Sequence, residues 1–138
     1  MYQTYETELR VRPDDIDMHN HVHHSKYMDY VMAARYDQME RCYGLGMDKF
    51  IERGYSWLVR GVCMDFKRAL KMNEYFLVRT GIDSIDEKKC RVHFEILNKV
   101  TKKTCCDGWF DFVMIDIATG KGVKIPQDII EHYVAPVD

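Results

Sequence analysis

One stretch of this chain has the pattern of a long helix, and it limits the folds open to the whole sequence. Within residues 25–43, core-type positions recur every three or four residues, as on the buried face of an amphipathic helix. No proline or glycine occurs before Gly44, a natural stop, and Ser25 can cap the start. About 18 helical residues would span ~27 Å, enough to cross a whole sheet. The recurring positions are Met28, Val31, Met32, Arg35, Met39 and Cys42, with Tyr27, Tyr30 and Ala34 beside them.

Strand patterns make up most of the remaining chain. Residues 4–12 alternate between two faces, as in a half-buried strand, and Pro13 ends the pattern because proline cannot donate to a sheet ladder. After a short helical segment at residues 47–53, four stretches rich in β-branched and aromatic residues follow, with short turns between them. Such turns cannot hold crossover helices, so we expect antiparallel meanders. The four stretches are residues 55–69, 74–85, 89–100 and 104–117, and residues 125–133 should form a short closing helix.

The order of these elements predicts an α+β fold in which the long helix lies across one face of a curved sheet of five antiparallel strands. A chain of 138 residues is long enough for one domain with its own core and too short for two, so we expect a single domain over residues 1–138. The open edges of such a sheet need cover, which favours a homodimer or homotetramer.

Composition and charge narrow the classes of partner. The formal net charge of −2 gives no electrostatic reason to expect nucleic acid or an anionic membrane as a partner. No apolar run is long enough to span a bilayer, and the first ten residues lack the features of a signal peptide. The five cysteines are odd in number and form no C-x-x-C pair, which is typical of reduced thiols. We therefore expect a cytoplasmic protein.

The most unusual segment is residues 10–30, RVRPDDIDMHNHVHHSKYMDY, where aspartates and histidines gather in a few positions. Asp17, on a loop, can act as a nucleophile or activate water, and the start of the following helix offers unpaired N–H groups for an oxyanion. Asp17 can equally be an ordinary turn or capping aspartate. The alternating His19, His21 and His23 would share a face with Asp17 in an extended chain, which raises a metal-dependent hydrolase as a further hypothesis. No strong metal-ligand spacing occurs, so we predict no metal.

The run DDIDMHNHVHHSKYMDY resembles the signature of the hotdog-fold acyl-CoA thioesterases of the 4-hydroxybenzoyl-CoA thioesterase type. That signature is roughly D-x-D-x-x-G-x-V-x-x-x-x-Y, often with H-V-N-N in its middle. Asp15 and Asp17 match the D-x-D pair, and Val22 and Tyr27 match the valine and tyrosine. The resemblance implies a hotdog fold, with a curved five-stranded antiparallel sheet wrapped around one long helix. It also implies hydrolysis of an acyl-CoA to a carboxylic acid and coenzyme A, without a metal or redox cofactor.

The same resemblance implies roles for single residues. Asp17 falls on the family's catalytic carboxylate. His24 falls where one branch has a catalytic histidine and another uses a backbone N–H to polarise the thioester carbonyl. His21 matches the histidine of H-V-N-N, and His23 and His24 stand where the two asparagines would be. The expected catalytic residues are Asp17 and His24, and the expected substrate-binding residues are His21, His23, Ser25 and Tyr27.

The run also departs from the signature. The frequent glycine is replaced by His19 or Asn20, depending on the variant compared. The letters DIDMHNHVHH are similar to the DLDMNQHVNN form of acyl-carrier-protein thioesterases, with His19 where their catalytic asparagine stands. Two alternatives therefore stay open beside an acyl-CoA thioesterase: the same reaction on an acyl carrier protein, and a non-catalytic module that binds acyl-CoA or a partner protein.

Overall fold

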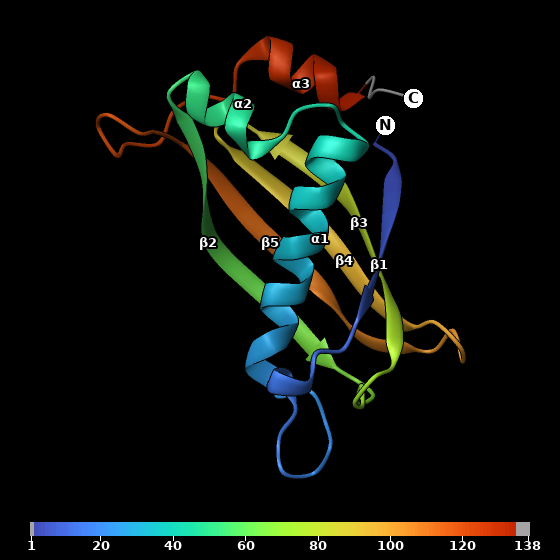
Figure 1. Ribbon diagram of the computed structural model, residues 1–138. Helices are drawn as coiled ribbons and strands as arrows, with labels where there is room; N and C mark the ends of the chain where they lie inside the picture. Colours follow the sequence, from blue (N-terminus) through green and yellow to red (C-terminus); the bar gives the residue numbers. More distant parts are fainter. Residues whose placement is uncertain (1, 135–138) are drawn as a thin grey trace.

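Five strands and three α-helices form the described part of the chain, residues 2–134 of this computed structural model (Figure 1). Met1 and residues 135–138, the ends of the predicted domain, lie outside the described residues. Every element expected from the sequence is present, and its ends differ from the expected ones by at most three residues. The elements are β1 (Thr4–Arg10), α1 (Tyr27–Arg41), α2 (Met47–Glu52), β2 (Tyr55–Phe66), β3 (Tyr75–Asp86), β4 (Lys89–Asn98), β5 (Thr104–Asp116) and α3 (Gln127–Val134), with 3₁₀ turns at Pro13–Asp15 and His24–Lys26.

The strands form one sheet in the order β1-β3-β4-β5-β2, and all neighbours are antiparallel. Strands β3, β4 and β5 follow one another as the expected meander. Strand β2 does not pair with β3, its successor in the chain; it pairs with β5 and forms one edge, and β1 forms the other. Register shifts between Val59 and Gly61 and between Ile82 and Ser84 mark β-bulges, which bend a strand. The sheet curves around α1, which confirms the predicted hotdog architecture (Figure 1).

The connection between β2 and β3, residues 67–74, has to cross from one side of the sheet to the other. On its way it meets the start of α1, where the N–H of Leu70 donates a hydrogen bond of 3.3 Å to the hydroxyl of Tyr27. The carbonyl of Leu70 accepts a hydrogen bond of 2.8 Å from the N–H of Val22, in the loop before α1. The crossing connection therefore holds the polar loop against the start of α1.

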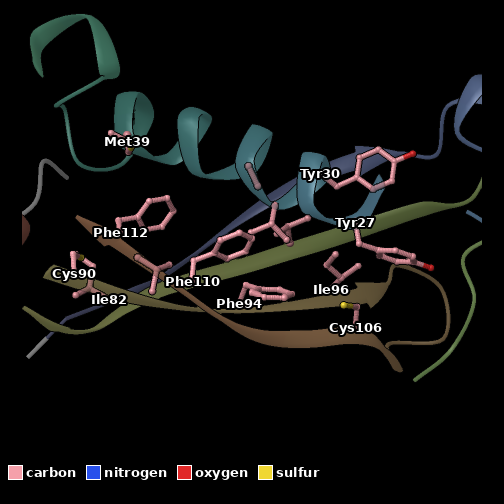
Figure 2. Close-up of a cluster of buried hydrophobic side chains, with 14 of the residues drawn as sticks. Tyr27, Tyr30, Met39, Ile82, Cys90, Phe94, Ile96, Cys106, Phe110 and Phe112 are labelled. Carbon is pink, nitrogen blue, oxygen red and sulfur yellow. The ribbon is translucent and has the colours of Figure 1, made fainter. Parts of the chain in front are cut away.

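Helix α1 buries the face that the sequence spacing predicted. Val31 and Ala34 have no exposed surface, and Tyr27 and Tyr30 are almost as deeply buried. Below them lie the aromatic rings of the sheet's inner face, and Figure 2 shows Phe94 and Phe110 among them. The helix ends at Arg41, three residues before Gly44, whose φ of 67° lies in the left-handed region that glycine adopts without strain.

The start of α1 differs from the expectation. The prediction that Ser25 caps the helix was wrong, because a tight 3₁₀ turn, His24–Lys26, precedes the first α-helical residue. Lys26 occupies the N-cap position of α1 and its side chain makes no capping hydrogen bond. The ring of His23 instead accepts a hydrogen bond from the N–H of Ser25 and caps the 3₁₀ turn.

Polar side chains connect α1 to the sheet inside the core. Gln38 has no exposed surface; its amide nitrogen donates to the hydroxyl of Thr7 in β1 (3.0 Å), and its oxygen accepts a hydrogen bond from Thr80 in β3. The hydroxyl of Thr80 also accepts a hydrogen bond of 2.9 Å from the guanidinium of Arg35. Buried polar groups are costly without such partners, so this network fixes the position of α1 over β1 and β3.

Two further expectations concern the cysteines and the membrane. All five cysteines are free, and only Cys63 is exposed. Among residues 2–134, no helix combines the length and apolar character that a membrane crossing requires.

Candidate active site

The polar loop folds into a tight turn and is not extended. The N–H of Asn20 donates a hydrogen bond of 3.1 Å to the carbonyl of Asp17, and the N–H of Asp17 donates one of 2.8 Å to the carbonyl of His21. Asn20 has a φ of 60°, in the left-handed region that asparagine tolerates better than most residues. The turn removes the alternation that would have placed His19, His21 and His23 on one face.

Asp17 lies at the base of this turn. Its Oδ1 accepts hydrogen bonds from the N–H groups of His21 (3.1 Å) and His19 (2.9 Å). Both bonds stabilise the charged form, so the pKa of Asp17 lies below its ordinary value. Within residues 2–134, its Oδ2 accepts no hydrogen bond. Asp17 is therefore an ionised carboxylate at neutral pH, with one oxygen held by the backbone and the other free.

Asp15, the first aspartate of the pair, has a different environment. Its side chain is only 3% exposed, and its Oδ2 accepts a hydrogen bond of 2.6 Å from the hydroxyl of Tyr30. The guanidinium of Arg12 lies 3.2 Å from the same oxygen. The backbone carbonyl of Asp15 accepts a hydrogen bond of 2.9 Å from the N–H of His23. Asp15 thus anchors both ends of the loop, and Asp17 is held at the surface between them.

The 3₁₀ turn at the end of the loop places two histidine rings together. The Nδ1 atom of His23 lies 2.8 Å from the Oγ of Ser25 and accepts a hydrogen bond of 3.3 Å from its N–H. The ring centroids of His23 and His24 are 4.3 Å apart. In the described part of the chain, the N–H of His24 donates no hydrogen bond. This free N–H lies at the N-terminal end of the turn that leads into α1, where backbone dipoles favour negative charge.

The structure brings most of the residues singled out in the sequence to one cavity of about 300 Å³. His23 and Ser25 do not line it; they lie next to it along the chain and bond to each other. The predicted site residues in its wall are Asp17, His21, His24 and Tyr27.

The remaining wall of the cavity comes from the end of β2 and the crossing connection. The ring of Phe66 meets the ring of Tyr27 edge-on, with 5.3 Å between centroids, and the ring of His24 at 6.4 Å. Lys67 and Arg68 follow Phe66 in this wall. The loop therefore contributes the carboxylate of Asp17 and the unbonded N–H of His24 to the site. The end of β2 and the crossing connection contribute the apolar ring of Phe66 and the cations of Lys67 and Arg68.

The sequence reasoning missed Phe66, Lys67 and Arg68. These residues lie far along the chain from Asp17, and only the crossing connection brings them to the loop. Their one local signal is two basic residues directly after an apolar strand, a pattern that is usually a solvated strand end.

The histidines are not arranged as metal ligands. Within residues 2–134, no group of three or more His, Cys, Asp or Glu side chains is placed to hold a metal ion. His21 belongs to the cavity wall, and the ring of His23 is bonded to Ser25. The chemistry open to this cavity is attack on an electrophilic carbonyl by a carboxylate or by water, next to an N–H that can hold the resulting oxyanion.

A family model of the thioesterase-like superfamily matches residues 11–132, which include the whole loop, α1 and the sheet except β1. The chain belongs to the thioesterase-like superfamily. It is an enzyme of that superfamily, and its reaction class is thioester hydrolysis.

Relatives of known structure or activity agree with this membership. The long-chain acyl-CoA thioesterase FadM of Escherichia coli is 19% identical over 129 residues, covering 91% of this chain and 94% of FadM. The DHNA-CoA thioesterase of Staphylococcus aureus superposes with a TM-score of 0.87 at 19% identity, over 95% of this chain and 89% of that chain. Slr0204, a 1,4-dihydroxy-2-naphthoyl-CoA thioesterase from Synechocystis, gives a TM-score of 0.87 at 16% identity, covering 96% and 97%. At such identities the structural likeness shows the shared hotdog fold.

Proposed function

We propose that this protein hydrolyses an acyl-CoA to a carboxylic acid and free coenzyme A, with Asp17 as the catalytic carboxylate. The observation that carries the proposal is the state of Asp17: ionised, held through Oδ1 by two backbone N–H groups, and lining the cavity with Oδ2 unbonded among residues 2–134. An aspartate that only stabilises a turn has no need to line a cavity, whereas a catalytic aspartate must, because its carboxylate has to reach the bound substrate.

The lowered pKa of Asp17 favours one of the two roles open to it. A general base works best with a pKa near the working pH, whereas Asp17 is a weaker proton acceptor than an ordinary aspartate. We therefore favour direct attack. Oδ2 bonds to the thioester carbon, the coenzyme A thiolate leaves and takes a proton from solvent, and water then hydrolyses the mixed anhydride to release the acid and regenerate Asp17.

The oxyanion that forms during this attack needs a donor. The N–H of Ser25 is already bonded to the ring of His23, so the free N–H of His24 is the group that we assign to the oxyanion. His24 also lines the cavity, and we propose that its ring relays the solvent proton to the leaving thiolate. His21 and Tyr27 would contact the substrate from the same wall, and His23 and Ser25 would fix the turn that presents the N–H of His24.

Coenzyme A is a polyanion, and the crossing connection places two cationic side chains, Lys67 and Arg68, in the cavity wall. Lys67 forms an ion pair of 2.8 Å with Asp107, which partly neutralises it. Arg68 donates a hydrogen bond to the carbonyl of Thr104 (3.0 Å) and has no carboxylate within 4 Å in residues 2–134. Arg68 is therefore our candidate for a phosphate contact. An acyl carrier protein, which is acidic, is the alternative thioester carrier.

We further propose that the working unit is a homodimer or homotetramer in the cytoplasm. Edge strand β2 is twelve residues long, and Leu58, Val62 and Phe66 on it are 54%, 43% and 48% exposed. A long exposed apolar edge invites pairing with a second copy. Because Phe66 also lines the cavity, such pairing would enclose the site. Light scattering that gives a monomer at micromolar concentration would contradict this arrangement.

A release assay for coenzyme A, run over acyl-CoA substrates of varied length with wild type and Asp17→Asn, tests the proposed function. We expect turnover by wild type and its loss in the variant. Acyl-carrier-protein substrates with the same acyl groups form a second series and identify the carrier. Binding of acyl-CoA without any release would instead favour a non-catalytic module, which the carboxylate at the cavity argues against, because the ligand is anionic.

A further inference from the structure

A buried charge in the core has no counterion among residues 2–134. The side chain of Arg35 in α1 is only 5% exposed, and its one hydrogen bond to the described part of the chain runs from its guanidinium to the hydroxyl of Thr80. Its guanidinium also lies over the ring of Tyr43, 5.2 Å from the centroid. Within residues 2–134, no carboxylate lies within 4 Å of it. Buried arginines are usually paired, because an isolated buried charge is costly.

The titratable groups near Arg35 do not supply the missing negative charge. Burial raises the pKa of the Cys90 thiol to about 12, even though Arg35 opposes this shift, so the thiol is neutral. Burial also raises the pKa of Tyr133 far above its ordinary value. The hydroxyl of Tyr43 is buried and has no hydrogen-bond partner within the described residues. The cluster of Arg35, Tyr43, Cys90 and Tyr133 therefore has a net positive charge and an unused donor.

All members of this cluster except Tyr43 line a small cavity of about 30 Å³, room for a group the size of a carboxylate. Arg35, Tyr36, Cys90 and Tyr133 supply the polar groups of its wall. The rest of the wall is apolar and rich in methionine, with Met32, Met39, Met47, Trp57, Val92 and Phe112.

The small cavity and the Asp17 cavity lie toward opposite ends of α1. Figure 2 shows Met39, Phe112 and Cys90 at one end of the core and Tyr27 at the other. From the start of the helix near Ser25 to Arg35, the helical rise gives ~15 Å. A flexible acyl chain that began at the Asp17 cavity could therefore reach Arg35 by following α1.

The route that we infer between the two cavities follows apolar side chains of α1 and β2. Phe66 and Trp57, near the two ends of β2, line the Asp17 cavity and the small cavity respectively. Between them Val62 is 43% exposed, and Met28 and Met32 on the facing helix are only partly buried. Methionine side chains adapt well to flexible ligands.

We propose that the acyl group carries a second acidic group at its far end, and that Arg35 binds this distal carboxylate in the small cavity. The substrate class is then an ω-carboxyacyl thioester, the monothioester of a dicarboxylic acid. This inference rests on the proposed function, which places the thioester at Asp17. A carboxylate would accept paired hydrogen bonds from the guanidinium and one from the hydroxyl of Tyr133, and would neutralise the buried charge.

The first test compares acyl-CoA substrates in pairs of equal length, one ending in a methyl group and one in a carboxylate, from short to long chains. We expect wild type to prefer the carboxylate by roughly 10²-fold or more in kcat/KM at the best length, because a site built for a polar group rejects an analogue that lacks it. Equal or better turnover of the methyl-terminated member at every length would overturn the inference and leave the proposed function standing.

Variants separate ligand binding from a structural role of Arg35. Arg35→Gln should remove the preference for the carboxylate, and Arg35→Lys, which keeps the charge, should retain most of it. Arg60→Gln removes an exposed positive charge on β2 and is the matched control, with an unchanged preference. A role in folding alone would lower turnover of both members of each pair equally in Arg35→Gln, which would contradict the inference.

A binding measurement covers the case in which the Arg35 variants do not fold or no acyl-CoA is hydrolysed. Free dicarboxylic acids should raise the Tm of wild-type protein more than monocarboxylic acids of the same length, since a ligand that binds only the folded state stabilises it. Protection by dicarboxylic acids without any thioesterase activity would support the Arg35 site and refute the proposed function. The absence of any such difference would refute the Arg35 site.

Discussion

The hydroxyl of Tyr30 donates a 2.6 Å hydrogen bond to the buried carboxylate of Asp15, and this contact ties α1 to the loop that presents Asp17. The Asp15 carboxylate also forms an ion pair with Arg12, and the backbone carbonyl of Asp15 accepts a hydrogen bond from the N–H of His23. Asp17, the second aspartate of the D-x-D pair, can therefore stay in the cavity wall and chemically available, because Asp15 is buried and anchors the loop.

We predict that Tyr30→Phe weakens this anchor. The variant leaves Asp15 buried with one partner fewer, and the loss of a hydrogen bond to a charged group should lower the free energy of unfolding by ~1–3 kcal/mol. The value of kcat should also fall, since the loop that holds Asp17 loses a constraint. Urea denaturation and the thioesterase assay measure the two effects. Tyr75→Phe, at a half-exposed tyrosine of β3, is the control and should change neither quantity.

Asp17→Asn should lower kcat by roughly 10²–10⁴, the range for losing a catalytic carboxylate. The KM should hold or decrease, because one negative charge near an anionic substrate is gone. Thermal stability should change little, since the side chain is only half-buried and the amide oxygen of asparagine can accept the same two backbone hydrogen bonds. Asp14→Asn, an exposed residue on the approach to the loop, is the matched control and should be mild. Equal losses in the two variants would show that Asp17 has no special role.

The pH profile should identify which group limits activity in acid. Hydrogen bonds from His21 and His19 lower the pKa of Asp17, so the carboxylate stays ionised as the pH falls through the ordinary aspartate value of about 3.9. If Asp17 alone must be charged, kcat/KM should decline only below that value, and the stability contributed by these hydrogen bonds should be lost in the same range. Circular dichroism at each pH checks that the chain is folded. A decline centred well above that value would instead assign the limiting ionisation to a group other than Asp17.

Activity should survive exhaustive chelation. The proposed reaction uses a carboxylate and a backbone N–H, and neither needs an ion. Turnover is measured before and after EDTA treatment, and again after zinc is added back. A loss with EDTA that zinc restores would make His19, His21 and His23 candidate ligands despite their placement in the turn.

Gly108→Ala should be strongly destabilising. Gly108 in β5 has a φ of 154°, and a Cβ atom there would lie 1.8 Å from the carbonyl oxygen of Cys63 in β2. The two strands would have to separate, so we expect a loss of more than about 2 kcal/mol in the free energy of unfolding. Gly120→Ala is the matched control: φ is also positive (71°), but nothing lies within 4 Å of its Cβ position, so only the ordinary cost of about 1 kcal/mol applies.

The local elements were predictable from the sequence because each has its own period. A repeat of three to four residues identified α1 and alternation identified β1, since burial of one face imposes these spacings on any helix or strand. The polar loop was recognisable because its aspartates and histidines are out of place in a core. Of the residues expected at the site, the structure places Asp17, His21, His24 and Tyr27 around one cavity; their roles remain predictions.

Only the tertiary structure decided how these pieces meet. The residue pattern within a strand does not determine which other strand it pairs with, so the pairing of β2 with β5 could not be predicted from the sequence of either strand. That pairing sends residues 67–74 across the start of α1 and brings Phe66 to the cavity of Asp17. The spacing that marked Arg35 as a buried helix position gave no information on its counterion. Whether a buried charge is paired depends on residues from other elements, here Thr80 and Tyr43, and these become neighbours only when the chain folds.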